Sequence, residues 1–290
     1  MLGVPFEGGA GGGGGASHGP DRVRELSRNV KTISRRGRDF GDLRVLDAGD
    51  VAADRFDLAG TVRVVRRAYD EVFRTATVPV VTFGGDHSIT YPIVAAAAAG
   101  RRLGLVWFDA HPDALDTYLG SRLSHGSPLR RVVDEGAVRP EDVLLVGTRA
   151  YDPGEPEFLQ EVGIREIRAA TFDDDRTAAF DDFRRAAAEI ATRVDGLYVT
   201  VDVDVLDAPV APATGTPVAG GIDTGTLLRL LELVPEPVVG YDVVEFAPPH
   251  DVGGVTGAAV MAVTTTILDR IAAARTGHRV LLPAASSEGR

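Results

Sequence analysis

Three side chains with metal-binding chemistry follow the most apolar stretch of the sequence. Residues 103–108 form a short, continuous apolar run bounded by turn-forming residues, which is typical of a buried strand. Asp109, His111 and Asp113 come directly after it, at intervals of two residues. In an extended segment side chains alternate between faces, so these three project together. Two carboxylates and an imidazole would therefore converge just beyond the end of a strand.

Two other strand-like runs end in polar residues of the same kinds. His87 follows residues 78–83, and Asp202 and Asp204 follow residues 197–201. Taken singly, each has an ordinary explanation as a loop histidine or a solvated or helix-capping aspartate. Together with the first group they make four carboxylates and two imidazoles, an oxygen-rich set without sulfur that suits Mn²⁺ better than a structural zinc site. Six ligands exceed what one ion usually takes from protein, so we predict two ions, roughly 3.5–4 Å apart, that turn a bound water into a nucleophile.

The rest of the chain alternates strands with helices. The strands are apolar on both faces, which predicts a parallel sheet with helices on each side and a ligand crevice at the carboxyl ends of the strands. No linker or composition shift marks a second domain, so residues 1–290 are expected to form one domain. The expected strands are 44–46, 78–83, 103–108, 143–146, 197–201 and 238–245; the expected helices are 23–30, 58–72, 91–99, 128–134, 224–233, 256–274 and one within 173–193.

Composition and charge exclude several classes of protein. A net charge of −11 disfavours an extended surface for nucleic acid or acidic membrane. The absence of cysteine excludes disulfides, thiolate metal sites and a cysteine nucleophile. No signal peptide or long apolar run is visible, so we expect a cytoplasmic protein. The glycine run at 11–15 lacks the Lys-Ser/Thr of a phosphate-binding loop and is expected to be a mobile loop, either on the surface or at the rim of the active site. The polar tail at 286–290 is expected to fray.

These motifs resemble those of the ureohydrolases, the family of arginase, agmatinase and their relatives. The resemblance implies an arginase-type three-layer α/β/α sandwich, assembly as homotrimers or hexamers, and two Mn²⁺ ions. It assigns one ion to His87, Asp109, Asp113 and Asp202, and the other to His111, Asp109, Asp202 and Asp204, with Asp109 and Asp202 bridging. The matching motifs are Gly-Gly-Asp-His-Ser at 84–88, Asp-Ala-His-x-Asp at 109–113, Ser-His-Gly at 124–126, Asp-Val-Asp-x-Leu-Asp at 202–207 and Thr-Gly-Thr-Pro at 214–217.

The resemblance also implies a reaction, the hydrolysis of a guanidino compound to urea and an amine. Glu245 matches the glutamate that binds the guanidinium group, and Thr216 matches the threonine that assists it. Asp113 would orient the nucleophile and carry its proton. His125 is the candidate proton shuttle, because an imidazole near its ordinary pKa can donate to the departing amine.

The motifs give conflicting indications of which guanidino compound is the substrate. Asp152 and Glu155 match an arginase segment that meets the α-amino group of the substrate, and Ser121 falls where arginases hold the α-carboxylate. Leu115, however, replaces an asparagine that arginases use for the same carboxylate, and hydrogen-bonding groups of this kind decide specificity.

The main expectation is hydrolysis of L-arginine to ornithine. The alternative is an agmatinase or another hydrolase of ω-guanidino or formimino compounds, such as agmatine, guanidinobutyrate or formiminoglutamate. Two other classes stay open: a zinc-dependent deacylase of related fold, which would use one zinc and fewer ligands, and a silent binding protein.

Overall fold

A seven-stranded sheet forms the middle of the molecule. The computed structural model describes residues 1–10 and 14–275. The strands lie in the order β1-β2-β7-β6-β3-β4-β5, and each neighbouring pair is parallel. Their bounds are β1 Leu2–Val4, β2 Val80–Gly84, β3 Leu103–Phe108, β4 Val143–Val146, β5 Arg165–Ile167, β6 Gly196–Asp202 and β7 Val238–Val244.

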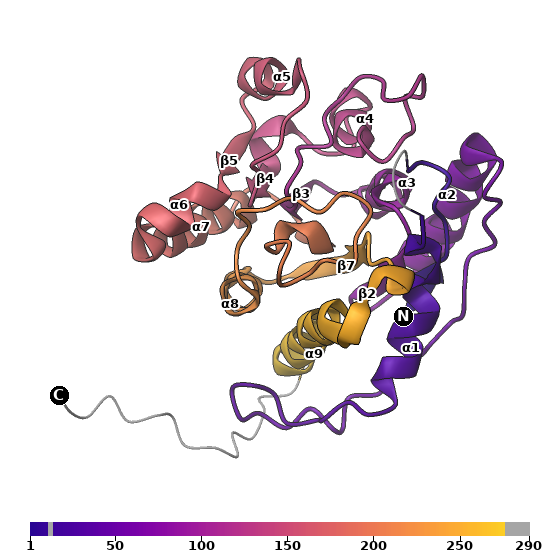
Figure 1. Ribbon diagram of the computed structural model, residues 1–290, viewed down its shortest axis with the longest axis vertical. Coiled ribbons are helices and arrows are strands. Elements are labelled where there is room, and N and C mark those ends of the chain that lie inside the picture. The colour runs from indigo at the N-terminus through magenta and orange to yellow at the C-terminus, as the bar shows by residue number, and fades with distance from the viewer. Residues whose placement is uncertain (11–13, 276–290) are drawn as a thin grey trace.

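Helices cover both faces of this sheet (Figure 1). One apolar core lies between the sheet and α2–α5, and a second lies between the sheet and α1 with α6–α9. Alternate residues of β3 belong to different cores, Leu105 and Trp107 to the first and Val106 and Phe108 to the second, as the period of a strand requires. The predicted three-layer α/β/α sandwich is therefore confirmed. The helices are α1 Gly19–Ser27, α2 Leu58–Thr75, α3 Thr90–Ala97, α4 Pro128–Asp134, α5 Glu155–Val162, α6 Ala169–Asp174, α7 Arg176–Ala191, α8 Thr224–Leu233 and α9 Val255–Arg275.

The strand predicted at residues 44–46 is wrong. Val45 and Leu46 are exposed, and this segment runs along the edge of the sheet without joining it. The Met1 amino group donates to the Leu46 carbonyl, and just afterwards Ala48 donates to the Met1 carbonyl and Gly3 bridges to Asp50. The helix predicted within 173–193 is α7. A separate short helix, α6, precedes it, and Asp175 divides the two because it is extended and caps α7 through the amides of Thr177 and Ala178.

The last described helix shows why hydropathy alone is a poor guide to its environment. Residues 252–275 are long and apolar enough to cross a membrane by length and composition. In the fold, Val260, Val263 and Ile267 of this stretch pack into the core beside the sheet, and α9 lies against α8 and α1. Its hydropathy is that of a core helix. The expected frayed tail at 286–290 lies outside the described residues.

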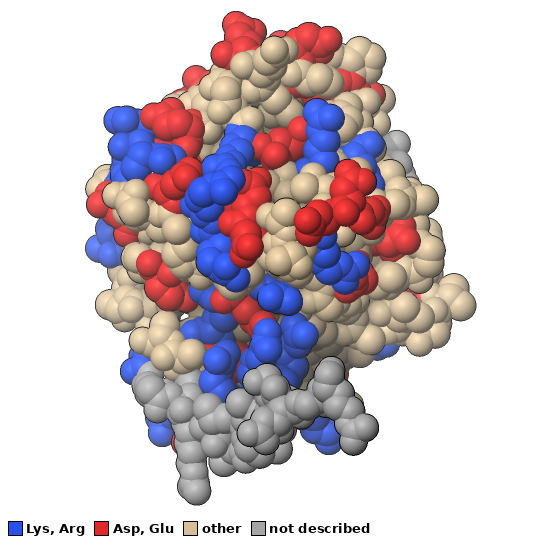
Figure 2. All heavy atoms as spheres, turned by 90° about the vertical axis from the view of Figure 1, so that its left-hand side faces the viewer, with Lys and Arg blue, Asp and Glu red and all other residues tan. Residues whose placement is uncertain are grey.

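The face shown in Figure 2 carries arginine and acidic side chains interspersed. On α7, which lies on that side, Arg184 pairs with Asp181 and Arg185 pairs with Asp182 one helical turn away. Exposed pairs of this kind contribute little to stability, roughly 0.3–0.5 kcal/mol each. On this face, the alternation of sign gives no continuous basic surface that would follow a nucleic-acid backbone.

Candidate metal centre and active site

The predicted site residues all follow the carboxyl ends of central strands. His87 begins a short 3-10 helix after β2, Asp109 follows β3, Asp202 ends β6, and Glu245 follows β7. These strands are neighbours in the order β2-β7-β6-β3, so their ends lie along one stretch of the sheet edge. The topology thus brings together residues separated by more than 150 positions in the chain.

The His87 imidazole lies at the centre of one group of carboxylates. Its Nδ1 is 3.0 Å from Asp109 Oδ2, 3.0 Å from Asp113 Oδ2 and 3.3 Å from Asp202 Oδ2. This nitrogen is fully buried and makes no hydrogen bond of good geometry, while Nε2 is hydrogen-bonded to Thr200 Oγ1 at 2.9 Å. A buried ring nitrogen that faces three carboxylate oxygens is the arrangement of a metal ligand, with the other ring nitrogen fixed by an outer partner.

A second group forms around His111. His111 Nδ1 lies 3.1 Å from Asp204 Oδ2 and 3.5 Å from Asp109 Oδ1. The two groups His87–Asp109–Asp202 and Asp109–His111–Asp204 each keep their ligand atoms within 4.8 Å of one another, and Asp109 belongs to both. The residues therefore fit two adjacent ions that share Asp109. Asp202 lies in the first group, and its role as a second bridge stays a prediction.

Neighbouring groups fix the direction of these carboxylates. Trp107 donates from Nε1 to Asp109 Oδ2 at 2.9 Å and stacks on the His87 ring at 4.3 Å between centroids. The amide of Ala110 donates to Asp204 Oδ1, and the amide of Asp204 donates to Asp202 Oδ1. The ligands are thus held in place by the protein itself, as precise metal sites require.

The charges at the site are strongly coupled. Burial and the charges of Asp204 and Asp109 raise the pKa of Asp202 well above its ordinary value. Burial would lower the pKa of His111, but hydrogen bonds to Asp109 and Asp204 outweigh it and raise that pKa to about 12. The same balance raises the pKa of His87, where Asp109, Asp113 and Asp202 supply the partners. Groups whose pKa values are shifted by burial and by specific charged partners are characteristic of functional sites.

His125 and Glu245 form a pair beside the metal-binding groups. His125 Nδ1 lies 3.2 Å from Glu245 Oε1, and the amide of His87 donates to the same oxygen at 2.9 Å. Burial lowers the pKa of His125, but the carboxylates of Glu245, Asp113 and Asp86 outweigh it and raise the pKa to about 9. Glu245 has a φ of 63°, an uncommon left-handed conformation for a residue other than glycine, and such strain concentrates at active sites.

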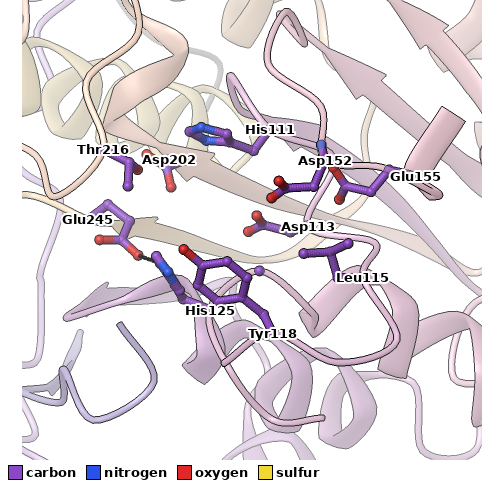
Figure 3. A pocket seen from close by; sticks show the side chains of 11 residues that line it. His111, Asp113, Leu115, Tyr118, His125, Asp152, Glu155, Asp202, Thr216 and Glu245 are labelled. Atoms are coloured by element: carbon purple, nitrogen blue, oxygen red, sulfur yellow. Dashed lines mark hydrogen bonds and ion pairs between the residues drawn. The ribbon is translucent and has the colours of Figure 1, made fainter. Parts of the chain in front are cut away.

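A single pocket joins these residues (Figure 3). Its walls combine part of the predicted metal set with the predicted catalytic residues, three of the four predicted substrate residues, and Leu115 and Tyr118 on the loop after β3. His87, Asp109 and Asp204 are not part of this lining. The Tyr118 ring packs 5.5 Å from the His125 ring, and Figure 3 shows its hydroxyl turned towards the pocket. Sequence reasoning missed Tyr118, although its place between His111 and His125 could have suggested it. The lining is His111, Asp113, Leu115, Tyr118, His125, Gly126, Asp152, Glu155, Asp202, Thr216 and Glu245.

Of the three residues predicted to bind the α-amino and α-carboxylate end of the substrate, only two line the pocket. Asp152 lines the pocket. Glu155 also lines it, but its two oxygens accept the amides of Ala114 and Asp152, so this carboxylate joins two loops, and burial raises its pKa to about 7. Ser121 does not line the pocket. It closes a tight turn with Tyr118, and its hydroxyl accepts the amide of Leu123, so the geometry does not support a substrate contact.

The described residues on either side of 11–13 make hydrogen bonds with neighbouring loops. The Gly9 amide donates to Asp86 Oδ2 at 2.7 Å, and the His125 amide donates to the Gly9 carbonyl at 3.1 Å. Gly15 donates to Glu7, and the Gly14 carbonyl bonds to His250. Residues 11–13 lie outside the described part of the chain.

The fold and this site define a class of protein, a hydrolase with a binuclear metal centre, and comparison with known proteins identifies the family. The sequence profile of the Arginase family matches residues 1–269. The chain is 40% identical over 269 residues to a guanidinopropionase from Pseudomonas aeruginosa, covering 88% of this chain and 81% of that one. It is 35% identical to the mitochondrial agmatinase of Gallus gallus, over 88% and 76% of the two chains. The structure of proclavaminate amidino hydrolase from Streptomyces clavuligerus superposes with a TM-score of 0.85 at 30% identity, over 94% of this chain and 91% of that one.

The chain belongs to the arginase family. Members of this family depend on a binuclear metal centre and hydrolyse guanidino C–N bonds, and the two groups around His87 and His111 could hold such a centre.

Proposed function

We propose that this enzyme hydrolyses a short ω-guanidino acid to urea and an amino acid, with two Mn²⁺ ions at the groups around His87 and His111. The expectation of L-arginine gives way to the alternative, since the relatives named above are a guanidinopropionase, an agmatinase and an amidino hydrolase. The observation that carries the proposal is the pocket wall formed by Leu115 and Tyr118. Leu115 offers no hydrogen bond to an α-amino-acid group, whereas the Tyr118 hydroxyl can donate to a single carboxylate.

The side chains divide the reaction between them. Glu245 and Thr216 bind the guanidinium group, and Asp113 orients the attacking water and accepts its proton. Water adds to the guanidinium carbon, the bond from that carbon to the alkyl nitrogen breaks, and His125 protonates the departing amine. Bound metal ions would make the water a nucleophile near neutral pH. The oxygen-rich ligand set is the basis for proposing manganese.

Agmatine is the second candidate substrate, and Asp152 favours it. No arginine or lysine is among the described residues that line the pocket, and Asp152 presents a carboxylate there. An ammonium group at the far end of the substrate would find a partner in Asp152, whereas a carboxylate would be repelled by it. The two candidates thus depend on different residues of one pocket.

The test is a steady-state comparison of 3-guanidinopropionate, 4-guanidinobutyrate, agmatine and L-arginine with the Mn²⁺-loaded protein, following urea release. Formamide release from formiminoglutamate is followed in parallel. We expect the highest kcat/KM for a guanidino acid. Tyr118→Phe should then raise its KM about tenfold or more, because a hydrogen bond to a charged group contributes roughly 1.5–3 kcal/mol, while Asp152→Asn should leave that KM unchanged or lower it.

The opposite pattern would establish agmatine as the preferred substrate. In that case agmatine has the highest kcat/KM, Asp152→Asn raises its KM and Tyr118→Phe does not. A preference for L-arginine would contradict the proposal. An absence of turnover with metal bound would restore the silent-protein alternative, and a requirement for one Zn²⁺ with acyl-lysine hydrolysis would restore the deacylase.

A further inference from the structure

Arg149 lies at the end of β4, beside the metal-binding groups, and binds the backbone rather than a carboxylate. Its guanidinium donates to carbonyl oxygens of three segments of the chain, and within the described residues no ion pair joins it to an acid. Nη2 lies 2.7 Å from the Asp204 carbonyl and 2.7 Å from the Val218 carbonyl. Longer hydrogen bonds reach the carbonyls of Gly147, Val205, Leu206 and Ala219. A planar group with five donors is suited to holding several carbonyls at once.

Two of the segments held by Arg149 contain predicted site residues, Asp204 and Thr216. The carbonyls of residues 204–206 belong to the turn after β6, which presents Asp204 to the second metal group. The carbonyls of residues 218–219 belong to the loop that presents Thr216 to the pocket. The Thr216 hydroxyl donates to Asp204 Oδ2 at 3.2 Å, so the two segments also meet at the site itself.

Other groups hold the two ends of this loop. At its start, the Ala213 amide donates to Thr256 Oγ1 at 3.0 Å, and the Ala213 carbonyl accepts the amide of Ala247 at 2.9 Å. Asp207 Oδ1 accepts the amides of Gly220 and Gly221 at 2.7 and 3.2 Å, and Leu206 pairs with Ile222 in an isolated bridge. A Cβ at Gly221 would lie 2.7 Å from Arg149 Nη2, so the backbone approaches the guanidinium closely there. The Thr216 loop is thus attached at both ends, and Arg149 holds residues 218–219 between them.

Arg149 also places a positive charge next to an acidic site. Burial lowers its pKa, and the charges of Asp204, Asp109, Asp207 and Asp202 oppose that effect. Arginine stays protonated under either influence. The residue therefore supplies a fixed charge as well as a fixed geometry.

We propose that Arg149 is a positioning residue. It fixes the position of the metal-binding turn at Asp204 relative to the guanidinium-binding loop at Thr216. The role at Asp204 depends on the metal site alone, and the role at Thr216 rests on the proposed function. Loss of the guanidinium should therefore weaken metal binding and raise KM for the guanidino substrate.

The experiment compares Arg149→Lys and Arg149→Gln with the native enzyme. Lysine keeps the charge but cannot span both segments, and glutamine removes the charge as well. Three properties are measured: Mn²⁺ binding to the metal-free protein by calorimetry, hydrogen exchange of residues 214–222, and kcat and KM separately. Arg270→Lys is the matched control, because Arg270 binds the carbonyls of Glu232 and Val234 and pairs with Glu236, and none of these residues lines the pocket.

Both Arg149 variants should bind one of the two Mn²⁺ ions about 10–100-fold more weakly, as changes to outer partners of a metal site do. Residues 214–222 should exchange faster while β3 and β6 keep their protection. The control should lower only the melting temperature. A lower melting temperature in the Arg149 variants, with metal affinity, local exchange and KM within twofold of native, would overturn the proposal.

Metal affinity and local hydrogen exchange test the role of Arg149 independently of the proposed function. If the native enzyme turns over none of the guanidines, the proposed function fails, and metal affinity and local exchange still decide the role of Arg149 at Asp204. If Arg149→Gln does not fold, the lysine variant decides the outcome alone.

Discussion

Glu245 contacts both the His87 group and His125, the proposed proton shuttle, through one oxygen atom. Its Oε1 accepts the His87 amide and lies 3.2 Å from His125 Nδ1. A guanidinium bound by this carboxylate would consequently lie next to both the His87 group and the imidazole that we propose as the proton donor. The left-handed backbone of Glu245 places the side chain here, directly after a buried strand.

His125 is predicted to act on the reaction and not on the metal. His125→Asn should keep both ions and the native melting temperature within a few degrees, because its ring belongs to neither metal-binding group. It should lower kcat about 10²–10⁴-fold, the usual size of a general acid's contribution. Steady-state kinetics together with metal analysis checks this. A variant that retains more than a tenth of native kcat would show that another group protonates the amine.

Asp202 is predicted to act through both ions. Its Oδ2 faces His87 in the first group, and its Oδ1 accepts the amide of Asp204, whose side chain belongs to the second group. Asp202→Ala should abolish tight Mn²⁺ binding at both positions, measured as metal content after dialysis. Asp57→Ala, which removes the N-cap of α2 and lies outside the pocket lining, is the control and should cost about 1 kcal/mol of stability with metal content unchanged. Retention of one full equivalent by Asp202→Ala would refute the bridge.

At the level of elements, the sequence predicts the strands and helices far better than the turns that connect their ends. The bounds of β3, β4, α4 and α8 agree with the residues expected from apolar runs and periodicity, because burial on both faces leaves a strong pattern. The edge strands β1 and β5 have three residues each, too few for any pattern to appear. The contacts of Arg149 were also invisible, since they go to backbone carbonyls that every residue carries.

The turn at Tyr118 is a second example, within the site, of a turn that the sequence does not predict. Leu119 and Gly120 have φ values of 51° and 77°, which reverse the chain and join Tyr118 to Ser121. Leucine gives no sequence signal for a left-handed conformation. The direction of Ser121 therefore could not be predicted, whereas the metal ligands could, because each follows a buried strand.

The loop after β3 is predicted to set the choice of substrate. Leu115→Asn would place an amide in the pocket wall where the sequence lacks one. Because a buried polar group discriminates strongly between substrates that do and do not satisfy it, the ratio of kcat/KM for L-arginine to that for 3-guanidinopropionate should rise about tenfold or more. Competition between the two substrates measures this ratio directly. An unchanged ratio would place the determinant elsewhere in the pocket, and Leu115→Met serves as the apolar control.

At the scale of the whole molecule, the sheet acts as a rigid support for charges that repel each other. Asp109, Asp202 and Asp204 are almost fully buried in one region, between two apolar cores. Without a metal ion, protons on His87 and His111 balance part of that negative charge, because their pKa values are raised. Folding, protonation and metal binding are therefore coupled in this protein.

This coupling predicts that metal binding releases protons. A histidine with a pKa raised to about 12, as at His111, is protonated at pH 7.5 in the metal-free protein, whereas a metal ion requires the neutral ring. Binding of two Mn²⁺ ions should therefore release about two protons from the imidazoles, and more to the extent that Asp202 and Asp204 are protonated. By linkage, the apparent affinity must rise with pH.

Calorimetric titrations with Mn²⁺ in two buffers of different ionisation enthalpy give the number of protons released. His111→Ala should release about one proton fewer, because it removes one titrating imidazole, while His250→Ala, which changes an exposed histidine outside the pocket, should match the native value. A binding enthalpy that does not depend on the buffer would mean that the imidazoles are already neutral. The carboxylates would then be held together by the amide, indole and hydroxyl donors around them, without the protons of His87 and His111.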